Sequence, residues 1–303
     1  MARTGYLAAE GFEHELHDEL LLAGVRTGRR HGRLVVTDGP AAGSAWAANV
    51  WHDVEEIAIT SIAHGAKELR DRQRNWAVYA PVHAGRARLI AEKLPYVSAK
   101  PIEIGGVAPS APLGSFTLIE PDRLLAATRC SSPFPNGETR LVEDRVGPPS
   151  RAYLKLFETL VRLRRWPVPG ESCLDLGASP GGWTWLLAGT GADVVAVDKA
   201  PLDPAVAALG NVRWEAGSAF ALDPRRCRPV AWLCSDVVCY PQRLLALVRR
   251  WVDADAAATM ICTIKFQGPT DHGIVREFAA IPGATVLHLS HNKHELTFVR
   301  VRP

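Results

Sequence analysis

The chain has 303 residues, of which 47% are hydrophobic and 22% are charged, and its net charge is +3. This length allows two domains with separate cores, and the composition is typical of a globular protein in water. No apolar run approaches the roughly 18 residues of a membrane-spanning helix, and the N-terminus has no signal-peptide core. The six cysteines show no C-x-x-C spacing, which argues against a zinc site. We therefore expect a cytoplasmic protein with no bound metal and no membrane partner.

The first 130 residues combine short apolar strands with helices. Phe12, Leu16 and Leu20 recur at helical spacing, and Gly24 ends that pattern. These residues predict a small α+β domain over residues 1–130. Its predicted helices span 12–23, 53–72 and 86–94, its strands span 6–9, 33–37, 45–51 and 76–82, and residues 115–119 and 124–128 form a hairpin.

Residues 131–149 are rich in proline, glycine and serine, and we place a linker there. From residue 150 to 303 helices and strands alternate, which predicts an α/β doubly wound sheet with ligands beyond the C-terminal ends of its strands. The last strand has a pattern that suits antiparallel pairing at an edge. The predicted helices span 151–164, 242–251 and 273–280, and the strands span 172–176, 194–197, 230–235, 260–264, 285–288 and 296–300.

A glycine-rich turn follows the first strand of this second domain, in Asp175-Leu-Gly-Ala-Ser-Pro-Gly-Gly-Trp-Thr184. Asp198 ends the next strand, where a carboxylate can accept hydrogen bonds from ribose hydroxyls. The glycine spacing differs from G-x-G-x-x-G, and Pro180 removes one backbone N–H that a pyrophosphate would use. The turn therefore favours S-adenosylmethionine, which has no phosphates, over a dinucleotide.

Four charged residues lie where a doubly wound sheet places its active-site groups. Asp236 and Lys265 each close an apolar strand, Glu295 opens the last one, and Lys155 lies on the helix before the first strand. Each alone has a simpler explanation as a helix cap or a solvated strand end. Four of them around one glycine-rich turn predict a catalytic cluster.

These motifs resemble the FtsJ/RrmJ-type ribose 2′-O-methyltransferases over nearly all of residues 150–303. Within that group the chain is similar to the RlmM family, which methylates a cytidine 2′-hydroxyl of 23S rRNA. Gly11-Phe-Glu13, followed by a helix, is also similar. The resemblance rests on Ser150-Arg-Ala-Tyr-Leu-Lys-Leu156, Asp175–Thr184, Ser235-Asp236, Ile264-Lys265 and Glu295.

The resemblance implies an S-adenosylmethionine methyltransferase domain with a smaller N-terminal ferredoxin-like, THUMP-like domain that binds RNA. It makes Lys265 the base for the ribose hydroxyl, assisted by Lys155, Asp236 and Glu295, and it requires no metal. Since only a neutral amine accepts a proton, burial and the nearby second cation would have to favour that form. The implied cofactor residues are Ser150, Gly177, Ser179, Pro180, Gly181, Gly182, Trp183, Asp198, Ser218 and Asp236.

One position departs from the family. An aspartate that contacts the adenine amine is usual near Ser218, and here Ser218 is the available acceptor, with Phe220 as a packing surface. Trp183 and Trp185 fit either stacking on a ligand or packing between helix and sheet. We interpret His288, His291 and His294 as a polar loop that contacts RNA.

Basic clusters provide a possible surface for RNA. Clustered arginine can follow a phosphate backbone even at low net charge, although a solvated surface explains any single cluster equally well. Two other hypotheses remain open: the RNA is a tRNA or mRNA, or the chain is a catalytically weak RNA-binding ribosome-assembly factor. The clusters are Arg26, Arg29, Arg30 and Arg33 with His31; Arg70, Arg72 and Arg74; Arg86, Arg88 and Lys93; and Arg162, Arg164 and Arg165.

Overall fold

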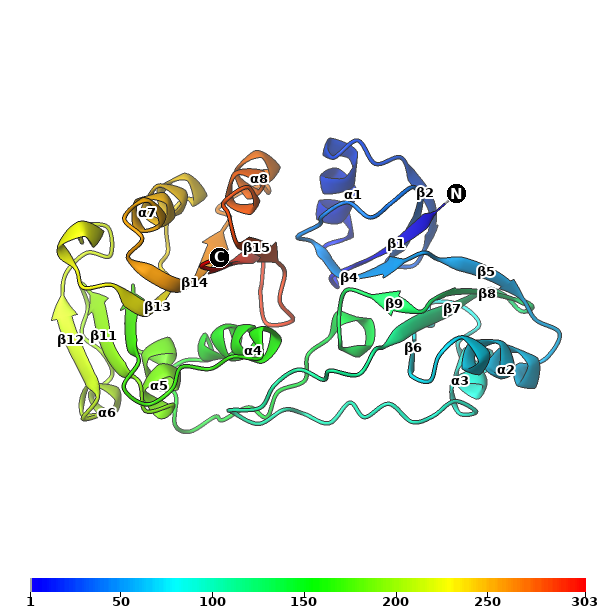
Figure 1. The fold of residues 1–303 in the computed structure, drawn as a ribbon, viewed down its shortest axis with the longest axis horizontal. Coiled ribbons are helices and arrows are strands. Elements are labelled where there is room, and N and C mark those ends of the chain that lie inside the picture. Colours follow the sequence, from blue (N-terminus) through cyan, green and yellow to red (C-terminus); the bar gives the residue numbers. More distant parts are fainter. Residues whose placement is uncertain (1) are drawn as a thin grey trace. The chain divides into compact units, whose positions relative to one another are not determined.

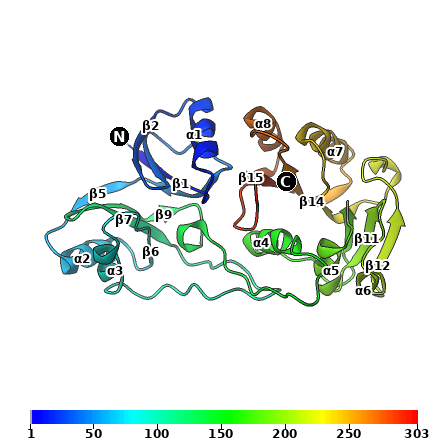
Figure 2. The ribbon, with the colours of Figure 1, turned by 180° about the vertical axis from the view of Figure 1, so that it is seen from behind.

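The computed structural model describes residues 2–303, which fold as two compact units (Figures 1 and 2). The N-terminal unit runs to Pro101 and continues over Ala108–Arg140, and the C-terminal unit comprises Ile102–Val107 and Leu141–Pro303. The division at residue 140 falls inside the linker predicted at 131–149. The sequence did not predict that residues 102–107 belong to the C-terminal unit. They are held there by a bridge of Ile102 to Leu141 and by the Trp166 indole, which donates to the Gly106 carbonyl at 2.8 Å.

The N-terminal unit contains a five-stranded antiparallel sheet in the order β2-β3-β1-β4-β9. One helix, α1 (Glu13–Leu22), lies between β1 and β2 in the chain, and the β3–β4 connection has no helix. The expected ferredoxin-like pattern β-α-β-β-α-β therefore lacks its second helix in this sheet. The strands are β1 (Arg3–Ala8), β2 (Thr27–His31), β3 (Leu34–Asp38), β4 (Ala47–His52) and β9 (Arg129–Cys130).

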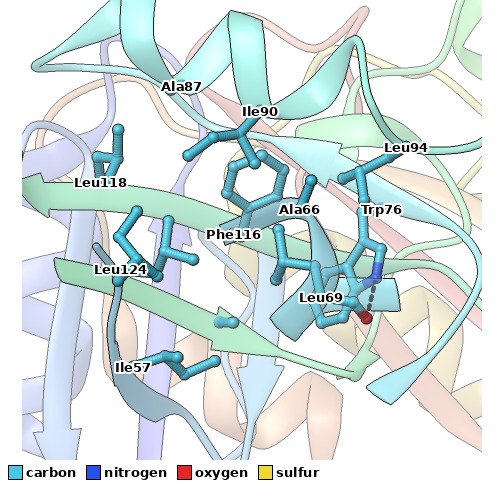
Figure 3. Close-up of a cluster of buried hydrophobic side chains, with 12 residues drawn as sticks. Ile57, Ala66, Leu69, Trp76, Ala87, Ile90, Leu94, Phe116, Leu118 and Leu124 are labelled. Carbon is cyan, nitrogen blue, oxygen red and sulfur yellow. Dashed lines mark hydrogen bonds between the residues drawn. The ribbon is translucent and has the colours of Figure 1, made fainter. Parts of the chain in front are cut away.

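A second sheet of this unit, in the order β5-β8-β7-β6, is covered by α2 (Ile62–Arg72) and α3 (Ala84–Ala91). Figure 3 shows its core, in which Phe116 and Leu118 of the sheet face Ile90 of α3. Hydrophobic burial of this kind is the main stabilising contribution to the unit. The strands are β5 (Glu55–Ala58), β6 (Trp76–Val78), β7 (Gly114–Glu120) and β8 (Arg123–Ala127).

The helix predicted at 53–72 is wrong over its first residues. Residues 55–58 form β5, which pairs with β8, and α2 begins only at Ile62. Ser61 caps that helix by accepting a hydrogen bond from the His64 backbone N–H at 3.0 Å. Pairing with a neighbouring strand therefore overrides the local helical tendency of this segment. The strand predicted at 76–82 is also shorter, because pairing with β7 ends at Val78.

The C-terminal unit is built on a seven-stranded sheet in the order β12-β11-β10-β13-β14-β16-β15. The first five strands in this order are parallel, and β16 is antiparallel to both of its neighbours. The predicted doubly wound sheet is thus confirmed, whereas the prediction that the last strand forms an edge is wrong, because β15 lies outside it. The strands are β10 (Ser172–Leu176), β11 (Asp193–Asp198), β12 (Val212–Ala216), β13 (Val230–Ser235), β14 (Ala257–Lys265), β15 (Ala284–Leu287) and β16 (Glu295–Val301).

Helices cover both faces of this sheet. In Figure 1, α4 and α5 lie on one face and α7 and α8 on the other. Helix α4 is unusual because every residue from Tyr153 to Val161 is buried, including Lys155 and Glu158. A charged side chain buried in this way requires a partner, and those partners form the site described next. The helices are α4 (Tyr153–Leu163), α5 (Gly182–Gly189), α6 (Pro204–Ala207), α7 (Pro241–Asp253) and α8 (His272–Ala279).

None of the helices in residues 2–303 is both long enough and apolar enough to cross a membrane.

Candidate active site

Four charged side chains meet at one edge of the seven-stranded sheet, and we call Lys155, Asp236, Lys265 and Glu295 the charged cluster. Asp236 directly follows β13, and Lys265 is the last residue of β14. Glu295 is the first residue of β16 and lies opposite Lys265 in the antiparallel register. Sheet topology therefore brings these three together, and α4 adds Lys155.

Ion pairs connect all four members. Lys155 Nζ lies 2.6 Å from Asp236 Oδ1 and 3.2 Å from Glu295 Oε1. Lys265 Nζ lies 3.1 Å from the same Asp236 oxygen and donates to the Asp236 carbonyl. Asp236 thus bridges the two amines, and the structure brings together the four residues that the sequence singled out.

The two lysines differ in their surroundings. Lys155 contacts two carboxylates and its side chain is 10% exposed, whereas Lys265 contacts one carboxylate and its side chain is 19% exposed. Lys155 therefore pairs with both acids, whereas Lys265 pairs with Asp236 alone and has the larger exposed surface. A proton acceptor must be reachable by its substrate, so Lys265 is the better placed of the two.

The glycine-rich turn, residues 177–183, connects β10 to α5 in a conformation that requires glycine. Gly177 has φ +78°, and a Cβ there would lie 2.7 Å from Val237 Cβ. Gly181 has φ +112° and precedes the first residue of α5. A Cβ on Gly182 would lie 2.5 Å from Ser150 Oγ, so Ser150 is packed against the turn. Side chains at these positions would clash or strain the backbone.

Asp198 holds the other side of the turn. Its Oδ2 accepts a hydrogen bond from the Ser179 backbone N–H and its Oδ1 accepts one from the Ala200 N–H, both at 3.0 Å. Each carboxylate oxygen has a second lone pair, which remains for the hydroxyls of a ligand. The carboxylate is therefore fixed in orientation before any ligand arrives.

A pocket of about 220 Å³ opens beside Asp198 and Gly177. Three of the predicted cofactor residues line it, namely Gly177, Asp198 and Ser218. The Ser218 hydroxyl accepts a hydrogen bond from the Phe220 N–H at 3.3 Å, so it also caps its own loop. The complete lining is Gly177, Asp198, Lys199, Gly217, Ser218, Ala219, Phe220, Val237, Val238 and Arg243.

Sequence reasoning missed Arg243 in this pocket. Its guanidinium carbon lies 3.8 Å from the centroid of the Phe220 ring, a cation–π contact between α7 and the loop after β12. Because Arg243 falls on the polar side of an amphipathic helix, the sequence pattern gave no signal that separates it from a solvated arginine. Arg243 and Phe220 together form a flat, positively charged part of the pocket lining.

Comparisons with known proteins match this part of the chain. Residues 148–242 match the family model described as FtsJ-like methyltransferase. Residues 148–242 form an FtsJ-like methyltransferase domain. The match includes Lys155, the glycine-rich turn, Asp198 and Asp236, and it ends before Lys265 and Glu295, which join the site through β14 and β16.

Curated relatives named ribosomal RNA large subunit methyltransferase M are also similar. The protein of Halorhodospira halophila is 39% identical over 165 residues, which cover 53% of this chain and 48% of the relative. That of Alkalilimnicola ehrlichii is 34% identical over 193 residues, covering 59% of this chain and 52% of the relative. The chain therefore matches about half the length of these relatives, and the resemblance seen in the motifs is confirmed.

Within the FtsJ-like domain, several predicted cofactor residues do not line the pocket formed by the described residues. Trp183 is 3% exposed and its indole N–H donates to the Ala152 carbonyl at 2.8 Å. Its ring ties the turn to the segment before α4, which is the packing alternative that the sequence left open. Trp185 packs edge-on against Tyr153, with ring centroids 5.4 Å apart. The other predicted residues outside the pocket lining are Ser150, Ser179, Pro180, Gly181, Gly182 and Asp236.

Asp175, on β10, has a buried carboxyl group that contacts α5 just after the glycine-rich turn. It is 1% exposed, and Thr184 Oγ1 lies 2.6 Å from its Oδ2. Burial raises the pKa of Asp175 to about 7, against the opposing effect of the Thr184 hydrogen bond. The first turn of α5 is thus anchored to β10 through a group that is partly protonated at neutral pH.

The histidine loop between β15 and β16 differs from the sequence interpretation. His288 is 8% exposed, and burial lowers its pKa to about 4, so its ring is neutral at pH 7. His288 Nε2 lies 3.1 Å from the Lys293 carbonyl, to which a neutral ring can donate. His291 pairs with Glu158 and His294 with Thr270. All three rings therefore have partners within the protein, and His288 is the one that is buried.

Among residues 2–303 no group of three or more His, Cys, Asp and Glu side chains is arranged to hold a metal ion.

Proposed function

We propose that this chain is an S-adenosylmethionine-dependent RNA ribose 2′-O-methyltransferase that acts on 23S rRNA. The charged cluster carries the proposal, because two amines and two carboxylates meet at the strand ends beside a ligand pocket. The names of the curated relatives supply the RNA. Since the chain matches about half the length of those relatives, the RNA and the complete activity are proposals for this chain.

The pocket residues suit an adenosine-containing cofactor. Asp198 has an oriented carboxylate for ribose hydroxyls. Because Gly177 has no side chain, a ligand can approach its backbone in the pocket. Ser218 and the Arg243–Phe220 pair would face the adenine, in place of the aspartate that is usual in the family. When bound, the cofactor supplies an electrophilic methyl group.

The charged cluster would handle the proton of the ribose hydroxyl. Lys265 accepts that proton as the hydroxyl oxygen attacks, because it is the more exposed amine and contacts a single carboxylate. Asp236 orients Lys265 through both its side chain and its carbonyl. Lys155 pairs with both Asp236 and Glu295 and so offsets part of their negative charge near Lys265. Holding base and hydroxyl in place supplies much of the rate.

The N-terminal unit would contribute to binding the RNA. Arg29 and Arg30 are exposed on β2, the edge strand of the five-stranded sheet, together with Arg26 just before it. On α2, Arg72 is engaged in ion pairs with Glu55 and Glu68, and the Arg70 guanidinium donates to the Lys93 carbonyl. We therefore assign the phosphate contacts to β2 rather than to α2. RNA affinity should fall steeply with salt if this assignment is right.

The test is methyl transfer from labelled S-adenosylmethionine to separate RNAs: 23S rRNA transcripts, tRNA and mRNA. The proposal predicts incorporation into 23S rRNA well above the other two. Incorporation into tRNA or mRNA alone would reassign the substrate. Cofactor binding by calorimetry without transfer to any RNA would favour an RNA-binding assembly factor instead.

A further inference from the structure

Helix α4 carries a second charged residue, Glu158, one turn beyond Lys155. Its side chain is fully buried, and both of its oxygens are occupied. Burial alone would raise the pKa of Glu158, but the hydrogen bond from His291 and the charge of Arg162 lower it to about 2. Glu158 is therefore an ionised carboxylate in the interior, which persists only where several donors surround it.

Most of these donors come from the loop between β15 and β16, residues 288–294. The Ser290 N–H donates to Glu158 Oε1 at 3.1 Å, and the His291 N–H donates to Oε2 at 3.3 Å. The His291 ring adds a contact of 2.7 Å from Nδ1 to Oε2. Arg162 closes the other side, with its NH2 nitrogen 2.8 Å from Oε1. One carboxylate thus fixes two successive backbone amides of the loop.

The same loop is linked by hydrogen bonds to Glu295 of the charged cluster. Asn292 Nδ2 donates to the Glu295 carbonyl at 3.1 Å and to Thr297 Oγ1 at 3.2 Å. The Lys293 N–H lies 3.4 Å from Glu295 Oε1, and the Glu295 N–H donates to the Lys293 carbonyl at 2.8 Å. Because these hydrogen bonds join residues only two to five positions apart, a shift of the backbone at residues 290–291 would also displace Glu295.

We infer that Glu158 is a positioning residue, which holds the 288–294 loop on α4 so that Glu295 reaches Lys155. This inference rests on the proposed function. Residues 155 and 158 lie on the same face of α4, since residues three apart are neighbours on a helix. One rigid helix therefore contacts the loop at 290–291 and Glu295 at the loop's end. Glu158 itself contacts no substrate, because its side chain has no exposed surface.

The main variant is Glu158→Gln, which keeps the shape and replaces one acceptor oxygen by an NH2 group. In either orientation of the amide that group faces one backbone N–H donor, that of Ser290 or that of His291, so the loop must shift. Since a displacement of about 1 Å in an active site can cost about a hundredfold, we expect kcat to fall at least tenfold. The cofactor Kd should stay within about threefold, because the loop does not line the cofactor pocket.

Glu171→Gln is the matched control. Glu171 also binds a backbone N–H, that of Val168 at 3.2 Å, and a ring N–H, that of Trp232 at 2.7 Å. It precedes β10 and so lies at the opposite end of the strand from the charged cluster. The control should lower stability without lowering kcat. Equal losses of kcat in the two variants would show a general effect of destabilisation and would overturn the inference.

Amide hydrogen exchange of the loop gives a readout that does not depend on activity. In Glu158→Gln, exchange at Ser290 and His291 should accelerate at least tenfold, with α7 unchanged. If this variant does not fold, His291→Ala retains the buried carboxylate and should show a smaller change of both readouts in the same direction. Wild-type kcat together with wild-type loop exchange would overturn the inference. Absence of methyl transfer by the wild type would instead refute the proposed function, and exchange would still decide the role of Glu158 in the loop.

Discussion

The glycine-rich turn and the charged cluster lie at the same edge of one sheet but are built in different ways. The turn is a single segment, residues 177–183, whose shape depends on backbone angles that glycine adopts. The charged cluster takes one side chain each from α4, the end of β13, β14 and β16. The turn should therefore tolerate changes of charge nearby but not added volume. The cluster should respond to charge and position, and its variants should leave cofactor binding intact.

Removal of the proposed base should have the largest effect. In Lys265→Met the side chain keeps its approximate length and loses the amine, so methyl transfer should fall by about 10²–10⁴, the usual contribution of a general base. Calorimetry should give a cofactor Kd within about threefold of wild type, because the turn is untouched. Single-turnover kinetics with RNA would measure the rate. A variant with a near wild-type rate would contradict the role of Lys265.

The buried support of the turn predicts a pH-dependent stability. The pKa of Asp175 is raised to about 7 in the folded state, against an ordinary value of about 3.9 when unfolded. The folded state thus binds more protons between these values, and its unfolding free energy falls as pH rises from about 4 to 7, by up to about 4 kcal/mol. Asp175→Asn cannot ionise and should lack this decline in urea unfolding.

The exposed Asp193→Asn is the control for that experiment and should keep the wild-type decline. A stability difference between Asp175→Asn and wild type that is the same at pH 4 and pH 8 would contradict a neutral, buried Asp175.

Added volume in the turn should reduce both stability and cofactor affinity. Gly177→Ala places a Cβ 2.7 Å from Val237 Cβ and 3.0 Å from Val237 Cα, at φ +78°. Strain and overpacking of this kind cost about 1–3 kcal/mol. Thermal unfolding and calorimetry with the cofactor would measure the two losses. Gly189→Ala, in the last turn of α5 with no atom near its Cβ, should be neutral or stabilising.

The smallest effect is expected for the ribose contact. Asp198→Asn loses the charge and places an NH2 group opposite the Ser179 or the Ala200 N–H, so the cofactor Kd should rise about tenfold, the equivalent of about 1.4 kcal/mol. At saturating cofactor the transfer rate should remain within about threefold of wild type. A large loss of transfer rate at saturating cofactor would contradict the view that the turn acts on cofactor binding and the charged cluster on the transfer step.

The sequence predicted the sheet and the cluster because both follow from strand ends. Asp236 and Lys265 close apolar runs, and parallel strands bring such residues to one edge. The antiparallel strand that begins at Glu295 completes the set. Edge strand β12 was not predicted because none of its residues is buried and polar and apolar residues alternate in it without an apolar run.

Other features depend on tertiary contacts that no local pattern contains. Glu158 follows apolar residues on α4, and its role becomes visible only from the backbone N–H groups of residues 290 and 291 that donate to it. The sequence left open whether the Trp183 ring stacks on a ligand or packs in the protein, and only the tertiary structure shows its hydrogen bond to the Ala152 carbonyl. Residues 102–107 join the C-terminal unit through contacts that composition cannot indicate, among them the bridge of Ile102 to Leu141 and the Trp166 indole hydrogen bond.

The site of methylation on the RNA tests the central claim most directly. A methyl group on a ribose 2′-oxygen blocks that oxygen from attacking the adjacent phosphate, so the neighbouring linkage resists alkaline hydrolysis. The account predicts that RNA labelled by this protein yields its label in alkali-resistant dinucleotides. It also predicts that Lys265→Met yields little or no label there. Label recovered in mononucleotides would place the methyl group on a base, and the charged cluster would then not be the site of ribose methylation.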